Sequence, residues 1–387
     1  MSTVQSIGGK ELRERLPRTA FAFRGYNVTN LGRTAELLAH EVYGPIVEEC
    51  LTTAGEIASD ELHRTINLLD RVRSQEETTL AAFADAVALI VAMECAQVRL
   101  LRELFDVDLL SASRTLGYSL GEIAALVCDG SIRLEDALPV PISMADDCAA
   151  LGENVRMGIL FSRGATLDQP AIDAACRELN LRGEGIIGVS AFLSPNTRLL
   201  LGEGNLVEQF RDHLSELFPG SVHLRIDDRR WPPLHTPVVW ERCVPNRAAR
   251  RMLVMPTHIK ENGPKLISMV TGAADYTEET IRPLLTKWVD HPQRVWDVVY
   301  ETLRVGIETI VHVGPAPNLL PSTYKRISDN VEVQLSRSAP RRFGGRFVST
   351  ISRRAWLANL LPKRSALLRA PYVRHVILED WLLEQQL

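Results

Sequence analysis

The sequence lacks the features that mark secreted, metal-binding or membrane proteins. Its 6 cysteines lie far apart and form no Cys-x-x-Cys pair, which argues against a disulfide framework or a zinc site and favours a reducing compartment. No His-x-x-x-His or paired-carboxylate spacing suggests a metal. The first 18 residues hold no apolar signal segment, and charges interrupt the longest apolar runs. We therefore expect a soluble, cytoplasmic protein.

Net charge and chain length further limit the class of protein and its domain organisation. A formal net charge of −4 is too small for a dedicated nucleic-acid binder, so no nucleic-acid partner is expected. The 387 residues exceed one small core, which predicts a large domain with an insert or satellite. Val333 to Leu378 is unusual because it contains ten Lys or Arg and no Asp or Glu.

The order of apolar patterns predicts an α/β fold in three parts. A short strand over Thr19–Phe23, helices within Glu36–Ile66 and Thr78–Leu104, and a strand over Thr309–Val313 indicate the larger unit, residues 19–151 plus 228–332. Residues 152–227 alternate in the order strand, helix, strand, strand, helix, strand, which is typical of a ferredoxin-like unit. Residues 333–387 form a basic C-terminal extension, with Val373, Val376, Ile377 and Trp381 at helical spacing.

One pentapeptide carries candidate chemistry. Gly117-Tyr118-Ser119-Leu120-Gly121 matches the G-x-S-x-G nucleophile elbow and lies between a predicted strand and a predicted helix. Glycine on either side removes the Cβ atoms that would clash in so sharp a turn. The helix that follows directs its free N–H groups and positive end at charge developing on an acyl carbonyl. Chance copies of the pentapeptide occur in many long proteins, so Ser119 is interpreted either as a nucleophile, which the strand and helix around it favour, or as part of a chance match.

A serine hydroxyl needs a base to attack at neutral pH. Of 9 histidines, His235 stands out because it lies in a proline-flanked loop where the chain returns from the predicted insert. From its position alone, His235 is interpreted either as this base or as a loop histidine that caps backbone groups.

Five segments in order resemble malonyl-CoA:acyl-carrier-protein transacylases and polyketide synthase acyltransferase domains. Gly117–Glu122 resembles the family's G-H-S-L-G-E elbow, and Leu234–Pro237 its histidine loop. Ser268–Gly272 is similar to its S-x-x-T-G segment, while His291–Trp296 and Val311–Pro315 are similar to its N-P-V-x-W and E-V-G-P elements. The resemblance covers roughly residues 19–327 and implies an α/β-hydrolase-like core with a ferredoxin-like insert.

The resemblance also implies a mechanism. Ser119 takes an acyl group from a CoA or carrier thioester, His235 moves the proton, and the thiol of an acyl carrier protein's phosphopantetheine arm accepts the acyl group. The implied oxyanion hole is the backbone N–H of Tyr26 and of Leu120. A backbone carbonyl in the loop near Gly314 would orient the histidine. No bound cofactor is implied beyond the phosphopantetheine of donor and acceptor.

Departures from the family pattern concern the acyl pocket. Tyr26 stands where the family has glutamine, and Tyr118 stands where it has histidine. Met144 takes the place of the arginine that holds a malonyl carboxylate, and Leu193 that of an asparagine. A buried carboxylate without its partner is costly. We therefore expect an acyl group without a free carboxylate.

Other possibilities stay open at this point. Arg24, Arg229 and Arg230 are alternative cations for the pocket, although we interpret each as a solvated surface charge. An editing hydrolase would use the same Ser119 and His235, and a non-catalytic carrier-docking protein would explain the lost supporting residues. The basic extension would attract an acidic carrier protein or an anionic membrane, or it packs on the main domain with its charges solvated.

Overall fold

The computed structural model describes residues 7–163, 165–214, 222–260, 262–336, 360 and 363–385, with only the backbone of 333–336. A fully parallel sheet with strand order β7-β2-β1-β8-β9 forms its centre. The strands are β1 (Thr19–Phe23), β2 (Arg114–Gly117), β7 (Lys265–Ile267), β8 (Thr309–Val313) and β9 (Arg374–Ile377). The predicted mixed α/β class is confirmed.

Strand β1 separates two apolar layers. Phe21 and Phe23 enter the larger core, whereas Ala20 and Ala22 enter the smaller one, as the alternation of a strand buried on both faces requires. The larger core is covered by α3 (Gly44–Leu62), α4 (Leu68–Arg73), α5 (Phe83–Phe105), α6 (Leu120–Cys128), α8 (Pro139–Gly152), α12 (Val244–Val254) and α13 (Ile281–Trp288). The smaller core is covered by α14 (Val295–Arg304) and α15 (Leu319–Ser336).

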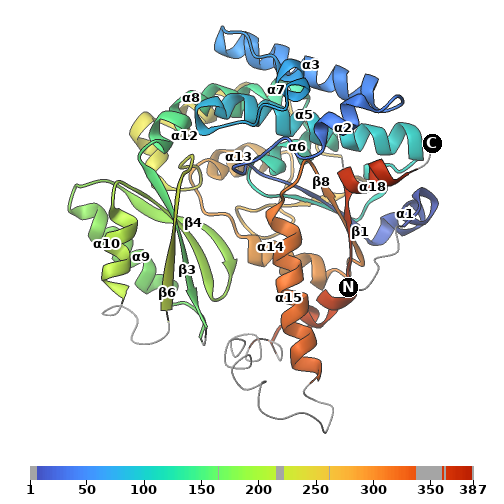
Figure 1. Cartoon of the computed structure of the whole chain (residues 1–387). Helices are drawn as coiled ribbons and strands as arrows, with labels where there is room; N and C mark the ends of the chain where they lie inside the picture. The colour runs from blue at the N-terminus through green and yellow to red at the C-terminus, as the bar shows by residue number, and fades with distance from the viewer. Residues whose placement is uncertain are drawn as a thin grey trace.

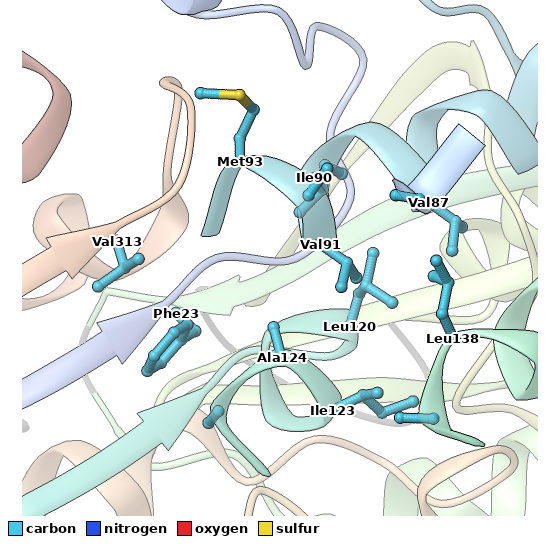
Figure 2. Close-up of a cluster of buried hydrophobic side chains, with 14 of the residues drawn as sticks. Phe23, Val87, Ile90, Val91, Met93, Leu120, Ile123, Ala124, Leu138 and Val313 are labelled. Carbon is cyan, nitrogen blue, oxygen red and sulfur yellow. The ribbon is translucent and has the colours of Figure 1, made fainter. Parts of the chain in front are cut away.

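Helix α5 is the central buried helix. Its residues Val87, Ile90 and Val91 face side chains of α6, with Phe23 nearby at the end of β1 (Figure 2). By length and composition, Leu80–Phe105 could cross a membrane, although Asp85 and Glu94 interrupt its apolar run as expected from the sequence. Because 78% of its most apolar window is buried by protein, it is the core helix of this domain.

A second, antiparallel sheet lies to one side of the parallel sheet (Figure 1). Its strand order is β4-β5-β3-β6, and α9 and α10 pack on one of its faces around a separate apolar cluster. The elements are β3 (Val155–Ser162), α9 (Gln169–Leu181), β4 (Ile187–Ser194), β5 (Thr197–Glu203), α10 (Leu206–Asp212) and β6 (Val222–Arg230). This is the βαββαβ order expected for residues 152–227, with β6 continuing to Arg230.

The predicted helical segments near the two ends of the chain differ in outcome. Within Glu36–Ile66 the structure has two helices, because α2 (Thr34–Ala39) ends before α3 begins at Gly44, and His63 closes α3 in a left-handed conformation. Near the C-terminus, the helical spacing of Val373 to Trp381 misleads: Arg374–Ile377 is β9, and α18 (Leu378–Glu384) begins after it. The open edge of β8 provides backbone partners that outweigh the helical pattern.

The predicted basic extension is only partly described. Residues 337–359, 361–362 and 386–387 lie outside the described part of the chain, and the expectation for them stays a prediction. The remainder, from 363 to 385, packs on the main domain through β9 and α18. Shorter helices are α1 (Gly9–Arg15), α7 (Leu134–Ala137) and the 3-10 turns Leu16–Arg18, Leu80–Ala82, Leu109–Ser111, Pro237–Arg242 and Ser365–Tyr372.

Candidate active site

Ser119 occupies a strained turn between β2 and α6. Its backbone has φ +54° and ψ −118°, a conformation that non-glycine residues rarely adopt and that functional sites retain. A Cβ on Gly117 would lie 2.1 Å from the carbonyl of Gly121, and one on Gly121 would lie 2.4 Å from the Arg24 carbonyl oxygen. The two glycines of the elbow are therefore required by close backbone contacts, as the motif predicts.

The structure brings Ser119 and His235 together from positions 116 residues apart. The Oγ of Ser119 lies 2.6 Å from Nε2 of His235, and the residues are 8% and 4% exposed. His235 itself has a positive φ of 67°, and its backbone N–H donates to the Val289 carbonyl at 2.8 Å. At this distance the two atoms form a hydrogen bond, along which a proton can pass from the serine hydroxyl to the imidazole.

The carbonyl that orients His235 belongs to Trp288, which corrects the expectation for Gly314. Nδ1 of His235 lies 2.7 Å from the Trp288 carbonyl oxygen, one of the carbonyls left free where α13 ends. The N–H of Gly314 instead donates to the Gln97 side chain at 2.7 Å, and its Cα faces Arg24 and Glu94. With Nδ1 donating to a carbonyl, Nε2 is left unprotonated to accept from Ser119.

Two side chains that the sequence did not single out hold the elbow from both sides. The N–H of Ser119 donates to Oε1 of Gln293 at 3.1 Å, and Nε1 of Trp288 donates to the Ser119 carbonyl at 2.8 Å. Gln293 belongs to the His291–Trp296 segment that carried the resemblance, but the pattern gave it no role. Its location follows from tertiary structure, since it pairs with the backbone of Ser190 and Phe192.

The predicted oxyanion donors lie beside the nucleophile. Leu120 is the first residue of α6, where backbone N–H groups have no partner within the helix. The loop containing Tyr26 packs directly on the elbow, because a Cβ on Gly25 would lie 2.5 Å from the Tyr118 carbonyl oxygen. Tyr26 and Leu120 both line the cavity above Ser119. Their role as oxyanion donors stays a prediction.

A cavity of about 390 Å³ opens over Ser119 and His235. The predicted pocket residues Tyr118, Met144 and Leu193 all line it, and Met144 is 1% exposed. Most of the wall is apolar, from both the parallel-sheet domain and the insert. It comprises Phe83, Val87, Pro141, Cys148, Met157, Ile159, Leu199, Leu201, Trp231, Pro232, Leu234, Trp288 and Leu319.

Charged residues of the cavity belong to one strand. Arg225, Asp227 and Arg229 line it from alternate positions of β6, and the two arginines are solvent-exposed. Arg229 pairs with Asp227 at 2.7 Å. Arg230 is exposed as expected. The described lining residues on α8, the helix that carries Met144, are Pro141, Met144 and Cys148.

Arg24 is a buried structural residue, which corrects its interpretation as a solvated charge. It is fully buried, its Nε donates to the Gly25 carbonyl at 2.8 Å, and one terminal nitrogen donates to Asn30 at 2.7 Å. Burial lowers its pKa to about 10. Because it also donates to the Pro315 carbonyl, Arg24 fixes the first loop against the segment after β8.

Burial shapes the acid–base properties of the site. Desolvation lowers the pKa of His235 to about 4, against the opposing effect of its hydrogen bond to Trp288. Desolvation raises the pKa of Glu122 on α6 to about 7, although Tyr276 and the Met269 N–H donate to its carboxyl group. His235 is therefore a neutral acceptor at pH 7, and Glu122 anchors the Ser268–Gly272 segment next to the elbow. In the described residues, no group of three or more His, Cys, Asp or Glu is placed to hold a metal ion.

Comparison with known proteins gives two curated relatives at 24% identity, while no protein-family model matches the chain. The malonyl CoA-acyl carrier protein transacylase of Haemophilus influenzae matches over 323 residues, 81% of this chain and 94% of that protein. The hybrid PKS-NRPS synthetase iccA of Talaromyces variabilis matches over 189 residues, 48% of this chain but only 4% of the synthetase.

Solved structures show the same fold. FabD from Acinetobacter baumannii has a TM-score of 0.63 at 20% identity, covering 80% of this chain and 91% of that chain. The acyltransferase domain from the second module of the salinomycin polyketide synthase has a TM-score of 0.60 at 21% identity, covering 79% and 65%. The transacylase PlMCAT, solved in complex with the acyl carrier protein AntF, has a TM-score of 0.60 at 22% identity, covering 81% and 93%. The chain is thus a divergent relative of the malonyl-CoA:acyl carrier protein transacylases and polyketide synthase acyltransferase domains, which are transferases.

Proposed function

We propose that this protein transfers an acyl group from a thioester to the phosphopantetheine thiol of an acyl carrier protein through an acyl-Ser119 intermediate. The observation that carries the proposal is the 2.6 Å contact between Ser119 Oγ and His235 Nε2 at the base of a largely apolar cavity. The names of the transacylase relatives support the carrier as acceptor, since one was solved with its carrier protein bound.

The reaction proceeds in two balanced halves. Ser119 Oγ attacks the thioester carbonyl while its proton passes to His235 Nε2, and the resulting oxyanion faces the N–H groups of Tyr26 and Leu120. The C–S bond breaks, and the leaving thiolate takes the proton from His235. The carrier thiol then loses its proton to His235, and its sulfur attacks the acyl-serine carbonyl. The bond between the acyl carbon and Ser119 Oγ breaks, and Oγ takes the proton back from His235.

We propose an acyl group without a free carboxylate as substrate. Met144 is buried where the relatives' pattern has the arginine that would pair with a carboxylate, and Leu193 contributes another apolar surface. A desolvated carboxylate in such a wall would lack a partner, which costs several kcal/mol. We also propose that the exposed Arg225 and Arg229 on β6, which line the cavity, attract the phosphate of a phosphopantetheine arm.

Intact-protein mass spectrometry tests the proposal. The protein is incubated with acetyl-, butyryl-, octanoyl- and malonyl-CoA, alongside Ser119→Ala and the matched control Ser190→Ala. Ser190 also lines the cavity, but its hydroxyl bonds to the Leu234 carbonyl. We expect an adduct on the wild type and on Ser190→Ala, none on Ser119→Ala, and less with malonyl-CoA than with the uncarboxylated donors.

Transfer is tested by adding carrier protein to the acylated enzyme. Loss of the adduct with equal gain of mass on the carrier supports the transferase reaction. Release of free acid in the presence of carrier would instead identify an editing hydrolase. Failure to form any adduct from either acyl-CoA or acyl-loaded carrier would overturn the catalytic proposal and favour a carrier-docking role.

A further inference from the structure

A second cavity, of about 630 Å³, lies at the opposite edge of the parallel sheet from Ser119. Four of its lining residues, Arg18, Ser113, Glu308 and Val373, immediately precede strands β1, β2, β8 and β9. Parallel strands all begin at one edge, so this cavity lies at the amino ends of the sheet. Ser119 follows the carboxyl end of β2, which separates the two sites by the length of the sheet.

Arginine dominates the lining of this cavity. The five arginines are Arg15, Arg18, Arg304, Arg369 and Arg374.

Three carboxylates face these guanidinium groups. Glu11 pairs with both Arg15 and Arg374, at 3.0 Å and 2.7 Å. Glu308 pairs with Arg18, and Glu301 pairs with Arg304.

The fifth guanidinium group, that of Arg369, has a backbone partner instead of a carboxylate. In the described part of the chain, Arg369 has no ion pair, and one of its terminal nitrogens donates to the Leu303 carbonyl at 3.3 Å. Five cations therefore share three anions, which leaves the cavity with a formal surplus of two positive charges.

The ion pairs at this cavity are weak competitors for a ligand. The side chains of Arg18 and Arg304 are 69% and 58% exposed, and exposed pairs of this kind contribute only about 0–1 kcal/mol. A phosphate group can take over these guanidinium groups, because their planar forks match its oxygens in bidentate fashion. Tyr372, 77% exposed, adds an aromatic face at the same cavity.

We propose that this cavity binds a nucleoside polyphosphate, with the arginines on the phosphates and Tyr372 against the base. The volume lies within the range of small-molecule sites, about 300–1,000 Å³. The surplus charge favours a ligand with at least two anionic groups, and the aromatic ring favours a ligand with a flat base. Free nucleotides and the nucleotide end of coenzyme A share this chemistry. The site is independent of the proposed acyl transfer at Ser119.

Titration calorimetry with ATP tests the site. Two charge reversals, Arg369→Glu and Arg304→Glu, alter the cavity. The two residues lie on different elements, so the second variant remains informative if the first fails to fold. Arg133→Glu is the matched control, since its side chain is 74% exposed and lines neither this cavity nor the one at Ser119. We expect each cavity variant to weaken ATP binding about tenfold or more, and the control to match the wild type.

Competing ligands separate the contribution of the phosphates to ATP binding from that of the base. We expect pyrophosphate to displace ATP and adenosine to displace it poorly, and added salt to weaken binding. If CoA binds more tightly than ATP and the same two variants weaken it, the cavity serves the coenzyme's nucleotide end. Absence of ATP and CoA binding at the cavity, shown by no heat or by equal affinity in folded wild type and variants, overturns the proposal while leaving Ser119 acylation intact.

Discussion

At the scale of single residues, the environment of His235 determines the pH range in which the proposed nucleophile Ser119 is active. Burial lowers the pKa of His235 to about 4, so the imidazole is neutral and can accept the Ser119 proton throughout the neutral range. We predict that the rate of Ser119 acylation, measured by quenched-flow mass spectrometry, rises through pH 4 and is already near its plateau at about pH 5.5.

The direction of this pH dependence follows from the sign of the pKa shift. A protonated His235 cannot act as a base, so activity is lost only as the pH falls toward the lowered value. An imidazole with its ordinary pKa would lose half of its activity near pH 6.5, at about the unperturbed value. A midpoint there, with the fold intact by circular dichroism, would contradict the buried, neutral base.

Gln293, like Trp288, is a residue whose importance only the structure reveals. Its side-chain oxygen accepts the Ser119 N–H, so Gln293→Leu frees the backbone of the strained elbow. We predict that acylation slows by roughly 10²-fold, since small misplacements of reacting groups cost about that much. Gln97→Leu is the control, because Gln97 is an equally buried amide that accepts the Gly314 N–H instead. Equal acylation rates for the two variants would assign Gln293 a purely structural role.

At the scale of elements, helix α8 carries the proposed choice of acyl group through Met144. Met144→Arg introduces a cation into the apolar wall of the cavity, where only a carboxylate ligand would compensate it. We predict that the ratio of malonyl to acetyl adduct rises. Without ligand, the variant should melt at a lower temperature than the wild type, and malonyl-CoA should raise its melting temperature part of the way back. Cys148→Ser, on the same helix and cavity, is the control. An unchanged adduct ratio in folded Met144→Arg would show that α8 does not select the substrate.

The sequence predicted those elements whose pattern is local. Strands β1 and β8 have the expected bounds, because short apolar runs ended by polar turns leave little choice. The elbow was predictable because two glycines are sterically required on either side of Ser119. Strand β9 was not predictable, since its residues follow a helical spacing and become a strand only beside the free edge of β8.

The candidate site divides in the same way. Ser119 and His235 lie within short motifs and could be named from them, but the orienting carbonyl of Trp288 could not. Every residue has a backbone carbonyl. Which residue orients His235 therefore depends on where α13 ends in space, and no side-chain type in the sequence marks it. Arg24 was misjudged for a related reason, because backbone carbonyls and Asn30 accept the hydrogen bonds of its buried guanidinium group, and such partners leave no pattern in the sequence.

At the scale of the whole molecule, the last elements tie the chain's two ends together. Trp381 on α18 is 3% exposed, stacks edge-on with Phe105 at 4.9 Å, and donates its indole N–H to the Ile7 carbonyl. Glu379 accepts backbone N–H groups of Arg33 and Ala316. The described end of the basic extension is therefore part of the folded core.

This packing makes α18 a determinant of global stability. We predict that Trp381→Ala lowers the free energy of unfolding by about 3–5 kcal/mol, the usual cost of removing a buried tryptophan. Urea denaturation measures this loss, and Tyr372→Ala is the control, because Tyr372 is 77% exposed and its removal should change stability by less than about 0.5 kcal/mol. If both variants unfold at the wild-type midpoint, β9 and α18 are a peripheral attachment. If only Trp381→Ala loses stability, a chain truncated before residue 363 would lack part of its fold. Weaker carrier binding by such a truncated protein would then not show that the basic extension docks the carrier.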